Sequence, residues 1–113
     1  MAHFNFNGKL YEANATIIGA DNRGLRYGDG LFETIRSKNE NLILLDEHLA
    51  RLWNGLKLLQ FEIPKLFSPD SIEKQIRQLL QKNKHDHARI RLSVIRGGGG
   101  LYDPKNLFPN HII

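Results

Sequence analysis

The 113-residue sequence contains no cysteine, a single methionine and a single tryptophan. Without cysteine, disulfides, thiolate metal sites and thiol catalysis are excluded. The longest purely apolar run covers only residues 42–45, whereas a membrane-spanning helix needs roughly 20 apolar residues, and no secretory signal is visible at the N-terminus. The five histidines show no metal-binding spacing. We therefore expect no membrane partner, no metal and a cytoplasmic location.

What the sequence does contain is typical of one globular domain over residues 1–113. Apolar residues make up 41% and charged residues 25%, which excludes wholesale disorder. The net charge of +4 is a mild excess of positive charge. It favours anionic ligands but is too small to require a nucleic acid.

The first half of the chain predicts two hairpins. Asn7-Gly8 is a strong two-residue turn signal, because a type I′ turn needs positive φ at both central residues. Residues 16–18 form a short strand candidate, and residues 31–37 and 42–45 flank a polar turn. Asp46 is the expected N-cap of a helix that follows this second hairpin.

Two amphipathic helices and a further pair of strands complete the predicted fold. The first helix has an apolar stripe at three- and four-residue spacing, and Ser68-Pro69 is a capping start for the second. Residues 88–95 alternate between apolar and polar, and residues 109–113 resemble the start of another strand. This order predicts an α+β fold, a mostly antiparallel sheet with two helices packed on one face.

The polar faces of two strands carry the first candidate site. Phe32, Thr34 and Arg36 share one strand face, and Arg91 and Ser93 share another. If both faces belong to the same side of one sheet, two guanidinium groups and an aromatic ring line one surface, which suits a carboxylate or phosphate. From the pattern alone, a solvated outer face is the simpler interpretation. The same holds for Arg51 and His48 as surface residues of the helix.

Four ordered motifs together resemble class IV aminotransferases, the fold-type IV pyridoxal-phosphate enzymes. They are NRGLRYGDGLFETIR at residues 22–36, LDEHLARL at 45–52, RIRL at 89–92 and the glycine run at 97–100. The resemblance covers the N-terminal domain of that family from end to end.

The resemblance implies a role for individual residues. Arg51 matches the arginine that binds the phosphate of pyridoxal 5′-phosphate in this family. The residues that match the substrate side of the site are Tyr27, Phe32, Arg36, Arg91, Gly98 and Gly99. The loop that follows residue 97 matches a segment which, in the family, approaches the neighbouring subunit, and a homodimer is accordingly expected.

The sequence also departs from the family pattern. The lysine that forms the Schiff base belongs to the family's C-terminal domain, which is absent here, so no catalytic residue is assigned and the chain alone is predicted to be inactive. D-amino-acid specificity is disfavoured, because the loop that follows residue 97 lacks the arginine and histidine of those members.

The resulting prediction is the N-terminal part of a pyridoxal-phosphate enzyme. A 4-amino-4-deoxychorismate lyase of folate synthesis is favoured over a branched-chain amino acid aminotransferase, with an amino acid or aminodeoxychorismate as substrate. Two alternatives remain open at this point. One is a non-catalytic oligomerisation domain of the same fold. The other is a small basic nucleic-acid-binding module that uses Arg89, Arg91 and Arg96.

Overall fold

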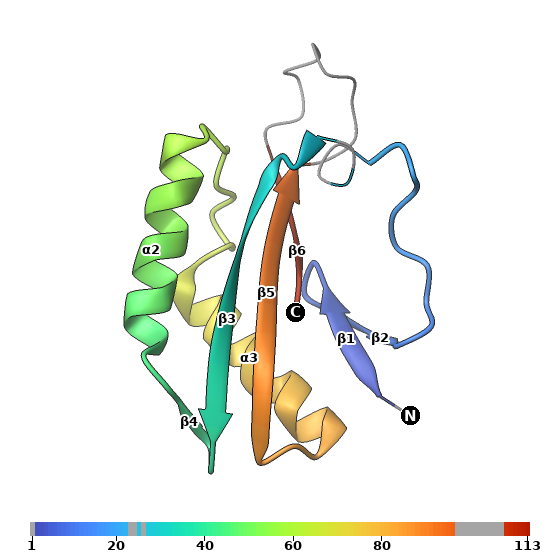
Figure 1. Ribbon diagram of the computed structural model, residues 1–113, viewed down its shortest axis with the longest axis vertical. Coiled ribbons are helices and arrows are strands. Elements are labelled where there is room, and N and C mark those ends of the chain that lie inside the picture. Colours follow the sequence, from blue (N-terminus) through green and yellow to red (C-terminus); the bar gives the residue numbers. More distant parts are fainter. Residues whose placement is uncertain (1, 23–24, 26, 97–107) are drawn as a thin grey trace.

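The computed structural model describes residues 2–22, 25, 27–96 and 108–113, and its strands form one antiparallel sheet (Figure 1). The six strands lie in the order β2-β1-β6-β5-β3-β4, and every neighbouring pair is antiparallel. The predicted α+β fold is therefore confirmed. The elements are β1 (His3–Phe6), β2 (Lys9–Glu12), β3 (Gly30–Lys38), β4 (Asn41–Leu42), α2 (Leu45–Leu58), α3 (Pro69–Asn83), β5 (His87–Arg96) and β6 (Pro109–Ile112).

The N-terminal hairpin forms where the sequence predicts it. Asn7 and Gly8 have φ values of 54° and 90°, the two positive angles that the tight turn between β1 and β2 requires. The expected strand over residues 16–18 is wrong, because this segment has no regular secondary structure. The outer edge of β2, the last strand at this side of the sheet, is not extended by residues 16–18.

The second hairpin is shorter than predicted, and the helix after it begins earlier. β4 contains two residues, and Leu45 already belongs to α2. Asp46 is not the N-cap. Leu44 holds that position with φ 56° and no side-chain cap, and its carbonyl oxygen accepts the hydrogen bond of the His48 N–H. The earlier start places Leu45 in the core, where it is 8% exposed, and leaves Asp46 in the first turn.

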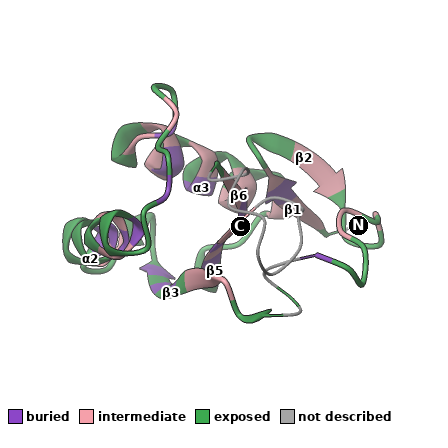
Figure 2. Ribbon diagram, turned by 90° about the horizontal axis from the view of Figure 1, so that it is seen from above, coloured by how far each residue is buried: buried purple, intermediate pink, exposed green. Residues whose placement is uncertain are grey.

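The second helix begins as its sequence predicts. Ser68 and Ser71 form a reciprocal capping box at the start of α3, and Pro69 occupies the first helical turn. Both helices cover the same face of the sheet (Figure 2). The core lies between them and the sheet, and it consists of Ile35, Leu45, Leu49, Leu52, Leu56, Phe61, Phe67, Ile72, Ile76, Ile90, Leu92, Val94 and Ile113.

The two longest strands, β3 and β5, have one face in this core and one face that neither α2 nor α3 covers. Along β5 the apolar residues at alternate positions, including Ile90, Leu92 and Val94, face the helices, as the sequence predicts. β3 alternates in the same way, with Phe32, Thr34 and Arg36 exposed on the opposite side. We call this second side the open face. No helix of the described chain is long and apolar enough to cross a membrane.

Candidate functional site

A carboxylate occupies a core-facing position of β3. Glu33 lies between Leu31 and Ile35 in the alternation of this strand, on the side that packs against the helices, and it is only 6% exposed. A buried carboxylate is costly unless cations or hydrogen-bond donors compensate it. The residues that contact Glu33 therefore define the first part of the site.

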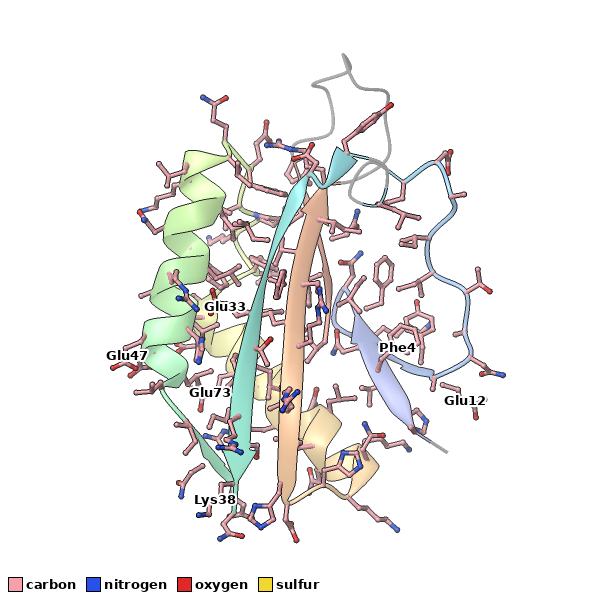
Figure 3. The ribbon with its side chains drawn as sticks, viewed as in Figure 1. Phe4, Glu12, Glu33, Lys38, Glu47 and Glu73 are labelled. Atoms are coloured by element: carbon pink, nitrogen blue, oxygen red, sulfur yellow. The ribbon has the colours of Figure 1, made fainter. Side chains whose placement is uncertain are left out.

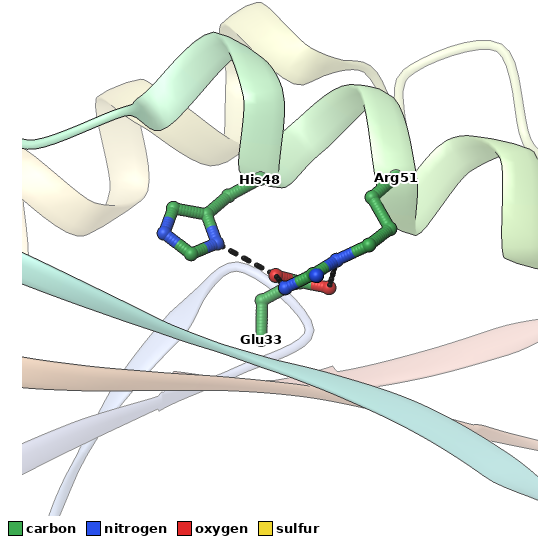
Figure 4. Close-up of polar contacts among 3 residues, drawn as sticks. All are labelled: Glu33, His48 and Arg51. Carbon is green, nitrogen blue, oxygen red and sulfur yellow. Dashed lines mark hydrogen bonds and ion pairs between the residues drawn. The ribbon is translucent and has the colours of Figure 1, made fainter.

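Glu33 is labelled on β3 in Figure 3, and Figure 4 shows that two side chains of α2 bind its carboxylate. The Arg51 guanidinium donates two hydrogen bonds, from Nε to Oε2 at 2.9 Å and from Nη2 to Oε1 at 2.7 Å. His48 Nδ1 lies 2.6 Å from Oε1. Because His48 and Arg51 are three residues apart, both lie on the same face of α2. The carboxylate fixes the orientation of both side chains.

These contacts leave the outer side of Arg51 available to a ligand. Guanidinium has five N–H donors, of which two are given to Glu33. The Arg51 side chain is 73% exposed, so its remaining donors face outward. The hydrogen bonds with Arg51 hold the pKa of Glu33 below its usual range, with a smaller effect of His48, although burial acts in the opposite direction. The same hydrogen bonds raise the pKa of Arg51.

A cavity of about 490 Å³ lies beside this cluster, between β3 and α2. Arg51 and Glu33 supply its charged groups, and Phe32 and Leu58 are among its apolar lining residues. Phe32 and Leu58 are 57% and 76% exposed, so together they form an uncovered apolar surface beside Arg51. The cavity is therefore lined by the Arg51 guanidinium together with the exposed apolar side chains of Phe32 and Leu58.

The open face brings together the other predicted residues. In the register of β3 and β5, Phe32 lies opposite Ser93 and Thr34 lies opposite Arg91, so the two polar strand faces are on the same side of the sheet. The Arg91 guanidinium stacks over the Phe32 ring, 4.3 Å from its centroid. Phe32 also lines the Arg51 cavity, so it connects the two groups of residues.

The remaining predicted residues have different positions. Arg36 is exposed on the open face, and Tyr27, which precedes β3, is 37% exposed. Gly98 and Gly99 lie outside the described residues. Arg96, assigned to the nucleic-acid alternative, donates from Nε to Oδ1 of Asp29 at 2.9 Å and lies over the Phe61 ring. This ion pair holds Arg96 at the end of β5 with 12% exposure.

Sequence reasoning missed Glu33 and misassigned His48. We expected His48 to be a surface histidine, but its side chain is 20% exposed and binds Glu33. The signal was present in the sequence. Glu33 stands on the same strand face as Leu31 and Ile35, and a carboxylate at a core position requires a cationic partner.

Replacing Glu33 by leucine tests how much the buried carboxylate contributes to the stability of the fold. Removing one partner of an ion pair is costly when the other charge is left buried, but Arg51 is 73% exposed and can be solvated without Glu33. At pH 7 we expect the free energy of unfolding of Glu33→Leu to be at most about 1 kcal/mol lower than that of the parent. Chemical denaturation measures this difference, and Asp46→Leu on the exposed side of α2 is the control.

The stability of the same variant can also be compared with that of the parent at acidic pH. Because folding lowers the pKa of Glu33, its contribution to stability is complete above the usual carboxyl pKa of 4.5 and is lost as the pH falls below that value. Glu33→Leu should lose less stability than the parent on acidification below pH 4.5. An identical acid response in both proteins would show that Glu33 is not a stabilised carboxylate.

The sequence is similar to one protein family and to several curated proteins. Residues 30–111 match the family model of amino-transferase class IV. A D-alanine aminotransferase of Bacillus licheniformis is 34% identical over 81% of this chain and 32% of its own length. A putative branched-chain-amino-acid aminotransferase of Methanocaldococcus jannaschii is 38% identical over 88% of this chain and 34% of its own length. An aminodeoxychorismate lyase of Bacillus subtilis is 36% identical over 80% of this chain and 31% of its own length.

Solved structures have the same fold. A branched-chain amino acid aminotransferase from Escherichia coli superposes with a TM-score of 0.88 and 25% identity, over 98% of this chain and 39% of that one. The T.th. branched-chain amino acid aminotransferase, complexed with N-(5′-phosphopyridoxyl)-L-glutamate, has a TM-score of 0.86 and 25% identity, with shares of 98% and 39%. A 4-amino-4-deoxychorismate lyase from Pseudomonas aeruginosa has a TM-score of 0.72 and 28% identity, with shares of 96% and 37%. The chain spans about a third of the length of the curated relatives.

Proposed function

The chain belongs to the class IV aminotransferase family, and we propose that it forms the N-terminal part of an enzyme that uses pyridoxal 5′-phosphate. The observation that carries this proposal is the Arg51 guanidinium. It is orientated by a buried carboxylate, directed at a cavity, and left with donors for an anion. The phosphopyridoxyl ligand of the T.th. relative supports the choice of cofactor.

The residues of the cavity fit a phosphate group. A guanidinium offers parallel N–H donors that match two phosphate oxygens, and the apolar surface beside Arg51 can contact an aromatic ring. Glu33 and His48 act as positioning residues, because Glu33 accepts two hydrogen bonds from Arg51 and His48 in turn contacts the Glu33 carboxylate. When bound, the cofactor supplies the electron sink for carbanion chemistry at the substrate.

The open face is proposed to bind the substrate. Arg36 and Arg91 are the candidate partners of a substrate carboxylate, because both are exposed and neither forms an ion pair with a described residue. Phe32 and Tyr27 are the candidate wall for the substrate side chain. Gly98 and Gly99 are proposed to complete this side of the site. The lysine that completes catalysis is proposed to lie in a C-terminal domain beyond these 113 residues.

For the reaction, we favour 4-amino-4-deoxychorismate lyase in folate synthesis. The lyase is supported by Gly28-Asp29-Gly30 and by the Bacillus subtilis relative. The branched-chain aminotransferase is the second candidate, supported by Phe32-Glu33 followed by Ile35-Arg36 and by the Methanocaldococcus jannaschii relative. D-alanine aminotransferases are also among the relatives, although the sequence disfavours D-specificity.

Product analysis distinguishes these reactions. With the cofactor and 4-amino-4-deoxychorismate, we expect p-aminobenzoate from a protein in which this chain is joined to a lysine-bearing C-terminal domain. Formation of a branched 2-oxo acid from valine and 2-oxoglutarate, without p-aminobenzoate, would support the aminotransferase instead. The 113-residue chain alone is expected to give neither product, and turnover by it would contradict the proposed division of the site.

We further propose a cytoplasmic homodimer. Uncovered apolar side chains such as Phe32 and Leu58 favour association with a second surface. Sedimentation velocity over a concentration series tests this proposal, and a strict monomer at all concentrations would contradict it.

A further inference from the structure

At the C-terminal end of β3, the open face carries basic residues in direct opposition. β3 contributes Arg36 and Lys38, and β5 contributes His87 and Arg89. In the register of the two strands, Arg36 lies opposite Arg89 and Lys38 lies opposite His87. Opposed residues of an antiparallel pair have Cβ atoms about 5 Å apart, and like charges at such positions destabilise the pair. The opposed guanidinium groups of Arg36 and Arg89 therefore carry an electrostatic cost.

No acidic side chain offsets this cost among the residues that the structure describes. Arg51, Arg77 and Arg96 each form an ion pair with a carboxylate. Arg36, Lys38 and Arg89 form no ion pair with any residue in the described part of the chain. These three cations of the open face thus differ from Arg51, Arg77 and Arg96, which their neighbours neutralise.

The opposed cations also line a cavity. It measures about 430 Å³ and is bounded by Arg36, Ser37, Lys38, His87, Ala88 and Arg89, with no acidic side chain among them. The acidic residues nearest in sequence, Glu40 and Asp86, line a different cavity with Arg77 and Lys84. The basic lining of the cavity at Arg36 and Arg89 therefore favours an anion.

This cavity is separate from the one at Arg51. Lys38, labelled at the lower end of β3 in Figure 3, is six residues from Phe32, which corresponds to about 20 Å along an extended strand. The two cavities have no lining residue in common. Arg36 is the only one of the opposed cations that the proposed function uses.

We propose that Arg36, Lys38, His87 and Arg89 form a second anion-binding site, for a compact ligand that carries at least two negative charges. Two guanidinium groups and an ammonium group match phosphate-ester or polycarboxylate oxygens, which share this chemistry. Such a ligand neutralises the opposed charges and stabilises the folded protein as its concentration rises above its Kd. The site does not depend on the identity of the reaction at Arg51.

Thermal unfolding with inorganic phosphate and with citrate, at constant ionic strength adjusted with sodium chloride, tests the proposal. We expect a saturable rise in Tm for the parent protein with at least one probe. A response to phosphate alone identifies a phosphate-ester ligand, and a response to citrate alone identifies a polycarboxylate. No saturable response to either probe overturns the proposal.

A pair of double variants of equal net charge provides the control. Lys38→Gln/Arg89→Gln removes two cations of the site, and Lys57→Gln/Lys74→Gln removes two exposed cations of the helices. The first should weaken the binding of the probe at least about tenfold and should keep or raise the Tm of the unliganded protein. The second should bind like the parent. Equal responses in both double variants would assign the effect to net charge and overturn the site.

The same variants separate this proposal from the proposed function. Lys38→Gln/Arg89→Gln should leave pyridoxal-phosphate affinity unchanged, because neither residue lines the Arg51 cavity. Conversely, Arg51→Ala should retain the response to phosphate or citrate. Loss of that response in Arg51→Ala would place the probe at Arg51 and overturn the second site.

Discussion

In a protein completed by the lysine-bearing domain, Arg51→Ala should weaken the binding of pyridoxal 5′-phosphate by about tenfold to hundredfold. The substitution removes the charge-assisted hydrogen bonds that we assign to the phosphate, and it leaves the Glu33 carboxylate without its principal partner. Absorbance titration of the cofactor gives the Kd. An unchanged Kd would remove Arg51 from the cofactor site.

Two further variants show whether the geometry of the guanidinium matters. Arg51→Lys keeps the charge but loses the planar fork, so it should recover only part of the affinity. Arg77→Ala is the matched control, because this exposed helical arginine pairs with Glu73 and does not line the cavity. A loss of affinity in Arg77→Ala equal to that in Arg51→Ala would indicate a general effect of charge.

The second large effect concerns His111 of β6. It is 6% exposed, its ring packs edge-on against Phe67, and its Nε2 lies 2.6 Å from Oε1 of Gln75. Burial lowers the pKa of His111 to about 4. Because the amide oxygen of Gln75 can only accept, Nε2 of the neutral ring carries the hydrogen and donates a hydrogen bond that links β6 to α3.

Acidification should destabilise the protein through this histidine. The unfolded chain binds a proton near pH 6.5 and the folded chain only near pH 4, so stability is complete above 6.5 and falls between 6.5 and 4. A loss of about 2–3 kcal/mol is expected over this range. Denaturation at pH 7 and pH 4 measures it.

Variants assign this acid response to one residue. His111→Gln should reduce the difference in unfolding free energy between pH 7 and pH 4, because glutamine does not titrate. His85→Gln, which alters an exposed histidine, should leave the difference in place. If His111→Gln retains the full loss, another group is responsible.

Local patterns were sufficient to predict most of the fold. The Asn7-Gly8 turn, the Ser68-Pro69 helix start and the alternation of β5 each depend on neighbours in the sequence, and all three are confirmed. The errors occurred where tertiary contacts decide. Residues 16–18 lack a partner strand, and burial of Leu45 moves the start of α2 ahead of Asp46.

In the candidate site, too, local patterns predict some features and tertiary contacts decide the others. Alternation along β3 and β5 predicts that Phe32, Arg36 and Arg91 face away from the core, and the structure confirms this. The contact between Arg51 and Glu33 joins residues 18 positions apart, on different elements. Spacing alone could not predict this contact, because it depends on how α2 packs over β3.

The most direct test of the phosphate role of Arg51 is a comparison of two ligands that differ only in the phosphate. The Kd of pyridoxal divided by that of pyridoxal 5′-phosphate is measured for the parent and for Arg51→Ala, in the completed protein. We expect a large ratio in the parent and a ratio at least about tenfold smaller in the variant, because the loss of the Glu33 contact affects both ligands and cancels in the ratio, whereas the loss of the phosphate contact does not. Equal ratios in the two proteins would show that Arg51 does not bind the phosphate.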